Sequence, residues 1–90
     1  MSKVYIALQD NDESRYIVEA IEEVNEDCTI IHQPAMIRIE REHKILVDRE
    51  VVEEKMGRDW NIQELHLNLI TLGGNVDEDD DLFTLAVTHY

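Results

Sequence analysis

Few side chains in this 90-residue sequence have the types and spacing that catalysis or metal binding requires. The four histidines are candidate metal ligands, but no two lie three or four residues apart, the spacing that places two ligands on one helix face. They are His32, His43, His66 and His89. Cys28 is a candidate nucleophile, yet it follows Glu26 and Asp27, whose negative charges raise a thiol pKa and suppress the thiolate. The sequence therefore predicts no metal site and a structural rather than reactive thiol.

The carboxylate run from Asp77 to Asp81 resembles a calcium loop at first sight, because hard cations prefer clustered carboxylates. The spacing does not fit. Counting Asp77 as the first ligand puts Leu82 where the loop needs glycine and Thr88 where it needs a bidentate glutamate. The run is interpreted as a solvated hairpin tip, with docking to a basic partner as the alternative, because such a partner would relieve the repulsion.

The remaining candidate motifs also favour structural roles. The segment Gly73-Gly74-Asn75 lacks both the G-x-G-x-x-G spacing and a phosphate-binding lysine, so it predicts a turn rather than a nucleotide site. Trp60 is predicted to be a core anchor. Neither Ser2 nor Ser14 stands in a hydrolase context. No catalytic constellation remains, which favours a protein that acts by binding.

Composition narrows the class of partner. The chain has 21 acidic and 8 basic residues and a net charge of -13, which disfavours nucleic acid and anionic membranes and favours a partner with a basic groove. Residues 59–90 contain seven Asp or Glu and no Lys or Arg, so one end should be acidic. One cysteine and the lack of an apolar run of about 18 residues predict a cytoplasmic protein. The length predicts a single domain over residues 1–90.

The elements that must position these residues follow from hydrophobic periodicity. Alternation predicts a strand over residues 3–8, and helical spacing predicts a helix over about 12–25, with a capping start at Asp10 and Glu13. Strands are expected over 28–32 and 36–40. The first half therefore reads β-α-β-β.

The second half is predicted to contain a strand over 44–48 and a short helix capped by Asp48 and ended by Gly57. Asn61 and Glu64 form a capping box for a further helix that ends near Leu67, where a strand begins. A last strand covers 82–87. The predicted fold is α+β, with two similar halves, β-α-β-β and β-α-α-β-β, in one compact domain.

Three segments of the sequence together resemble the effector component of bacterial multicomponent phenol hydroxylases. They run from Asn11 to Ile21, from Pro34 to Ile39 and from Glu64 to Asp81, in the same order and at the same intervals. Such effectors belong to the coupling-protein family of soluble di-iron monooxygenases, and the resemblance covers residues from about 3 to about 87.

The resemblance implies an α+β regulatory protein that has no cofactor and is not itself an enzyme. It implies binding to a di-iron hydroxylase component, where the effector promotes oxygen activation and coupled hydroxylation of phenol. The iron belongs to that partner, and flavin and iron-sulfur groups belong to a separate NADH-dependent reductase. No nucleic acid, membrane or small-molecule ligand is expected.

Contact residues are predicted at positions where the residue type is unfavourable for the fold alone. Asn68 and Thr71 are polar residues inside an apolar run, and the backbone at Gly73 and Gly74 can be approached closely. An alternative is that Asn68 caps a neighbouring helix or satisfies buried backbone groups. The predicted contacts are His66, Asn68, Thr71, Gly73, Gly74 and Asn75, with Asn11, Asp12 and Arg15 as a second patch and Asp79, Asp80 and Asp81 at the acidic tip.

Two other functions remain open from the residues alone. An acidic inhibitor or mimic would block a basic cleft and lower its partner's activity, whereas an effector raises it. A small ferredoxin-like sensing domain would change its thermal stability when its ligand binds.

Overall fold

The computed structural model describes residues 3–87, which form two antiparallel sheets and several short helices. The larger sheet has the strand order β2-β3-β1-β5 and the smaller the order β4-β7-β6. The strands are β1 Lys3–Gln9, β2 Thr29–Gln33, β3 Met36–Glu42, β4 Lys44–Asp48, β5 Leu69–Gly73, β6 Asn75–Glu78 and β7 Leu82–Ala86. The helices are α1 Asp12–Val24, α2 Arg49–Met56, the 3-10 turn η1 Ile62–Glu64 and α3 Leu65–Asn68. The predicted α+β class is confirmed.

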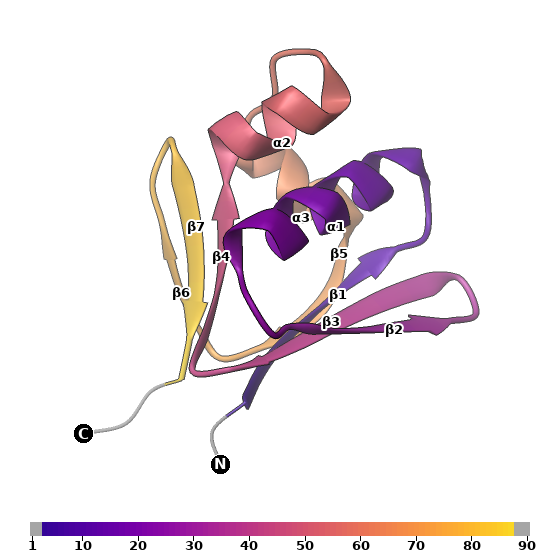
Figure 1. Ribbon diagram of the computed structural model, residues 1–90, viewed down its shortest axis with the longest axis vertical. Helices are drawn as coiled ribbons and strands as arrows, with labels where there is room; N and C mark the ends of the chain where they lie inside the picture. Colours follow the sequence, from indigo (N-terminus) through magenta and orange to yellow (C-terminus); the bar gives the residue numbers. More distant parts are fainter. Residues whose placement is uncertain (1–2, 88–90) are drawn as a thin grey trace.

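Figure 1 shows the helices gathered in the corner between the two sheets, with α1 over the four-stranded sheet and β4 beside it. The core fills this corner, and Trp60, which is 3% exposed, belongs to it as expected. Strand β5 comes from the second half of the chain but pairs with β1. The two halves of the chain therefore share one sheet.

Helix α1 forms where the apolar period predicted it, with Ile17, Ala20 and Ile21 fully buried. Its first turn differs from the expectation. The cap is Asn11 and not Asp10, because the Asn11 side chain accepts a hydrogen bond from the Ser14 backbone N–H. An Asn side chain at this position satisfies a backbone donor that the helix cannot satisfy itself.

The caps of the later helices are confirmed. Asp48 accepts from the backbone N–H of Glu50, and Gly57 ends α2 in the left-handed conformation at φ 74°. Asn61 and Glu64 form the expected capping box, although the turn that they open is a 3-10 turn that leads into α3. Capping depends on residues a few positions apart, which is why the sequence predicts it well.

The expectation for the second half was wrong in one respect. The boundary between helix and strand lies close to the predicted position near Leu67, since α3 ends at Asn68 and β5 begins at Leu69. The strand β6 was not predicted. All four of its residues are exposed because β6 is the edge of the smaller sheet, so it lacks the hydrophobic alternation that marks a half-buried strand. The second half therefore has three strands after its helices instead of two.

Candidate functional site

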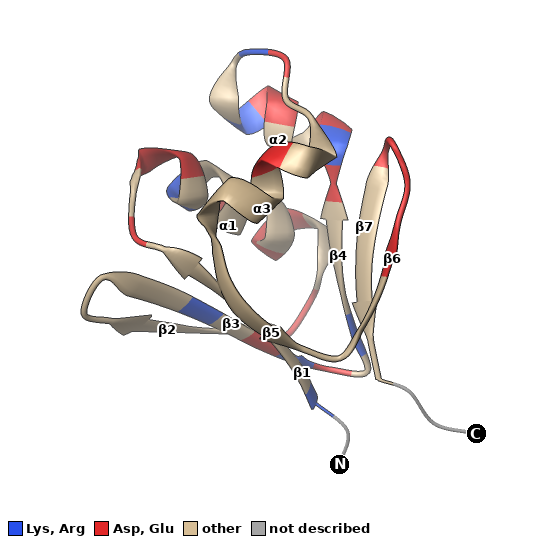
Figure 2. Cartoon of the chain, turned by 180° about the vertical axis from the view of Figure 1, so that it is seen from behind, with Lys and Arg blue, Asp and Glu red and all other residues tan. Residues whose placement is uncertain are grey.

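The predicted contact segment runs from α3 along β5 to the first residue of β6. Figure 2 shows α3 leading into β5 on the near side of the molecule, with β6 and the acidic hairpin tip beside them. His66, Thr71, Gly74 and Asn75 are exposed, and Gly73 is half-buried. Asn68 is only 7% exposed.

The structure joins the first predicted patch to the second through one side-chain hydrogen bond. Asn11 Nδ2 donates to Asn68 Oδ1 at 2.8 Å, across 57 residues of sequence. Asn68 therefore contacts Asn11, the residue that caps α1. This contact supports the helix cap, whereas the alternative considered from the sequence was that Asn68 caps a helix itself or satisfies buried backbone groups. The other two members of the second patch are exposed, and Arg15 pairs with Asp10 at 3.2 Å and with Asp12 at 3.4 Å. Exposed pairs of this kind contribute little stability.

The two adjacent glycines have structural reasons of their own. Gly73 lies opposite Tyr5 in the sheet, and a Cβ at Gly73 would come within 2.3 Å of the Tyr5 ring. The Arg38 guanidinium stacks on the same ring, 3.9 Å from its centroid. Gly74 has φ 138°, a conformation that L residues rarely adopt, and carries the chain from one sheet to the other. Accessibility to a partner is not needed to explain either glycine.

Three exposed apolar side chains lie in or beside the same segment and were not among the predicted contacts. Leu67 is 73% exposed, Ile70 is 45% exposed and Val76 is 46% exposed. For Leu67 and Ile70 the available signal was the segment from Leu67 to Leu72, in which four of six residues are apolar, more than the one buried face of a strand can cover. An exposed group of apolar side chains beside polar ones is typical of a protein-binding surface.

His66 connects α3 to the smaller sheet. Its Nε2 lies 2.8 Å from Glu78 Oε1 on β6, and its ring meets Phe83 of β7 edge to face, with 6.1 Å between the centroids. These contacts place α3 against the β6–β7 hairpin. The exposed apolar side chains are thus carried by elements that are fixed to both sheets.

The three aspartates at the hairpin tip have different surroundings. Asp79 Oδ1 accepts from the backbone N–H groups of Asp81 and Leu82, so it stabilises the turn. Asp81 pairs with Arg49 at 2.6 Å. Asp80 has no hydrogen bond or ion pair to the other residues of the 3–87 range, and it is one of the residues that line a cleft of about 450 Å³.

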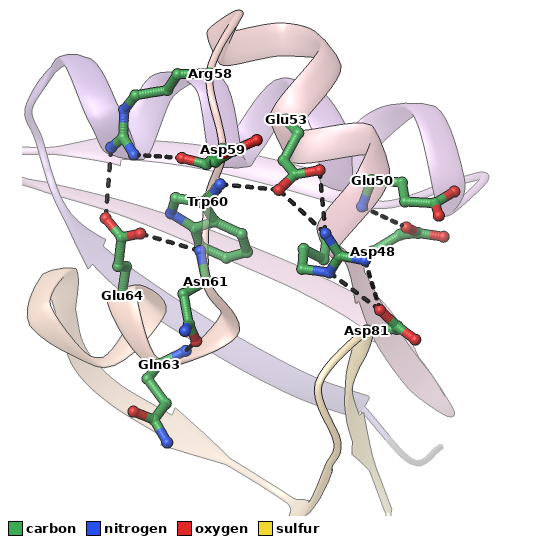
Figure 3. A network of polar contacts seen from close by, with 11 residues as sticks. Asp48, Glu50, Glu53, Arg58, Asp59, Trp60, Asn61, Gln63, Glu64 and Asp81 are labelled. Carbon is green, nitrogen blue, oxygen red and sulfur yellow. Dashed lines mark hydrogen bonds and ion pairs between the residues drawn. The ribbon is translucent and has the colours of Figure 1, made fainter.

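A polar network fixes this end of the molecule, as Figure 3 shows. Glu53 accepts hydrogen bonds from Arg49 and from the backbone N–H of Trp60. Because Arg49 also holds Asp81, the start of α2, the loop before η1 and the hairpin tip are tied together. The hydrogen bond to Asp81, with the neighbouring carboxylates, raises the pKa of Arg49 above its usual value.

Comparison with known proteins decides the family. The model of the MmoB/DmpM family matches residues 2–86. The chain belongs to the MmoB/DmpM family. It is 57% identical over 84 residues, 93% of each chain, to the stimulatory component DmpM of phenol 2-monooxygenase from Pseudomonas sp. (strain CF600).

Solved structures agree with this membership of the MmoB/DmpM family. A chain of a phenol hydroxylase–regulatory protein complex is 53% identical, with a TM-score of 0.92 over 97% of this chain and 100% of that one. Regulatory protein B of soluble methane monooxygenase shares the fold, with a TM-score of 0.76 and 21% identity over 96% of this chain and 65% of that one.

The candidate metal ligands of this MmoB/DmpM member remain apart. Within residues 3–87 no three His, Cys, Asp or Glu side chains form a group that could hold a metal ion. His32 lies on β2, His43 lies in the turn after β3, and His89 falls outside the described residues. In the same range no helix is long and apolar enough to cross a bilayer.

Cys28 is half-buried just before β2, and burial is the main cause that raises the pKa of its thiol, followed by the charge of Glu22. The sequence had pointed to Asp27 and Glu26. Asp27 contributes less than Glu22, while Arg41 acts in the opposite direction. The environment suppresses the thiolate, as predicted.

We expect iodoacetamide at pH 8 to alkylate Cys28 about fivefold or more slowly in the folded protein than in the urea-unfolded chain, because only the thiolate reacts. Mass spectrometry of timed samples measures both rates, and glutathione in the same urea concentration controls for the solvent. Equal rates in the two states would show that the folded environment does not suppress the thiolate.

Proposed function

We propose that this chain is the regulatory component of a multicomponent phenol monooxygenase and that residues 1–90 act as one effector domain. The observation that carries this function is the 57% identity to a phenol 2-monooxygenase stimulatory component over 93% of both chains. The protein has no catalytic role of its own. It binds the hydroxylase component and promotes oxygen activation and coupled hydroxylation there, without a cofactor of its own and in the cytoplasm.

The docking surface is formed by α3, β5 and the start of β6. Its exposed apolar side chains are Leu67, Ile70 and Val76. The uncharged residue Thr71 follows Ile70 in the chain, and the uncharged residue Asn75 precedes Val76. Such a centre is unusual in a chain of net charge -13. Interfaces bury an apolar centre and keep charged residues at the rim, and the acidic hairpin tip supplies the rim here.

The rim charges act mainly on the rate of association. A basic surface on the hydroxylase attracts the acidic tip over a range of about 8 Å at 0.15 M ionic strength. Of the three tip aspartates, only Asp80 can change its charge without disturbing the turn or the pair with Arg49. It is therefore the residue with which to test the rim.

We expect Asp80→Asn to slow association with the hydroxylase by about twofold to fivefold at low salt and to leave the dissociation rate unchanged. Stopped-flow measurements at several salt concentrations test this, and the difference should disappear at high salt. Thr29→Glu, on the far edge strand β2, is a control for the effect of charge elsewhere. Unchanged association at low salt would exclude the tip from the rim.

The function itself is tested with purified hydroxylase and reductase at fixed concentrations. Phenol turnover should rise with added chain and then saturate, and NADH consumption should become more tightly coupled to product. An inhibitor would instead lower the turnover. A ligand-sensing domain would leave turnover unchanged and shift its own unfolding temperature when a small molecule is added.

A further inference from the structure

Asn68 has one end of its side-chain amide fixed inside the protein and the other end free. Its Oδ1 accepts the hydrogen bond from Asn11 Nδ2. Its own Nδ2 has no hydrogen-bond partner within residues 3–87. Ser14 Oγ is the one side-chain polar atom in that range that is both fully buried and unpaired, so the Asn68 nitrogen keeps contact with solvent. Its neighbours Leu67 and Ile70 are exposed.

A single backbone group determines how both amides are oriented. The Ser14 N–H at the start of α1 can only donate, so the atom of Asn11 that receives it at 2.8 Å must be the oxygen. Asn11 therefore turns its NH2 group toward Asn68, and Asn68 must accept this hydrogen bond with its side-chain oxygen. The NH2 group of Asn68 is left on the side away from Asn11, in the segment that also carries the exposed residues Leu67 and Ile70.

We infer that Asn68 presents this oriented NH2 group to a carbonyl or carboxylate oxygen of the hydroxylase, and that Asn11 is the positioning residue that sets its orientation. The inference rests on the proposed function, because it places the donor in the proposed docking surface. A donor that is fixed before binding loses little conformational entropy on contact. A partner without an acceptor at this place leaves a polar group unpaired, which gives the contact specificity.

Asn11→Asp tests the orientation. Asp is also a good helix cap, so α1 keeps its start. Both oxygens of the new carboxylate are acceptors, so Asn68 must rotate its amide by half a turn to donate inward, which puts its oxygen outward. We expect the affinity for the hydroxylase to fall about tenfold while urea unfolding changes little. Titration calorimetry and urea denaturation provide the two readouts.

Two further variants separate orientation from added charge. Gln9→Glu adds the same charge at an exposed position of β1 without changing either amide, and its affinity should stay within about twofold of wild type. Asn68→Asp keeps an acceptor for Asn11 but removes the outward donor, so it should lose affinity about as much as Asn11→Asp.

The experiments distinguish failure of this inference from failure of the proposed function. Wild-type affinity in both Asn11→Asp and Asn68→Asp would overturn the inference, since each removes the outward donor by a different route. The proposed function would still stand, because the wild-type chain binds and stimulates the hydroxylase. If the wild-type chain neither binds nor stimulates it, the proposed function fails and the inference fails with it.

Discussion

Replacing Leu67 with Glu should weaken binding to the hydroxylase by about tenfold or more and leave the stability of the free protein almost unchanged. Leu67 is 73% exposed, so the free protein loses almost no packing when it is replaced. In the complex the same side chain would bring a charge into the apolar centre of the interface. Loss of a central anchor costs about 2 kcal/mol, and each 1.4 kcal/mol is a factor of ten in affinity. Titration calorimetry and thermal unfolding measure the two effects.

The charge itself requires a control. Thr29→Glu introduces the same negative charge at an exposed position of β2, which is the edge of the larger sheet opposite to β5. We expect its affinity to remain within about twofold of wild type. If both variants bind alike, with either wild-type or equally reduced affinity, the α3–β5 face is not the centre of the interface.

The parts of the fold that depend on local chemistry were predictable. The apolar period of α1 and the caps at Asp48, Gly57 and Asn61 involve residues within one or two turns, and each was found as expected. Strand β6 was missed because an exposed edge strand has no buried face to give it a pattern. The pairing of β5 with β1 was not predictable either, since it depends on how the chain packs and not on its local sequence.

The candidate site also has some features that the local sequence indicated and others that only the fold determines. The sequence selected Asn68 as an unusual polar residue, but its partner Asn11 is 57 positions away and only the fold brings the two together. The sequence treated the tip aspartates as equivalent, whereas Arg49, 32 residues before Asp81, makes one of them a structural pair. The sequence placed the boundary between helix and strand near Leu67 and did not indicate whether its side chain is exposed. Its exposure depends on which face of α3 packs against the hairpin.

Substitution of one of the adjacent glycines, Gly74, should have the second large effect, on the stability of the folded protein. The sequence suggested that two glycines offer backbone to a partner, but Gly74 has φ 138°, where an L residue costs about 1–3 kcal/mol. A Cβ there would also meet the Ala86 carbonyl oxygen, Leu85 Cδ1 and Val4 Cγ1, each at 3.0 Å. Core side chains and a strand backbone cannot easily move aside.

We therefore expect Gly74→Ala to lower the free energy of unfolding by about 2–4 kcal/mol and the melting temperature by about 10 °C or more. Gly57→Ala is the matched control, because Gly57 also has a positive φ, 74°, but a Cβ there meets nothing within 4 Å. It should cost only the backbone strain, about 1–2 kcal/mol. Urea and thermal unfolding of both variants measure the difference, which reflects the close contacts around Gly74 together with its less favourable φ. If Gly74→Ala unfolds like wild type but fails to stimulate phenol turnover, the glycine serves the partner and the structural explanation is wrong.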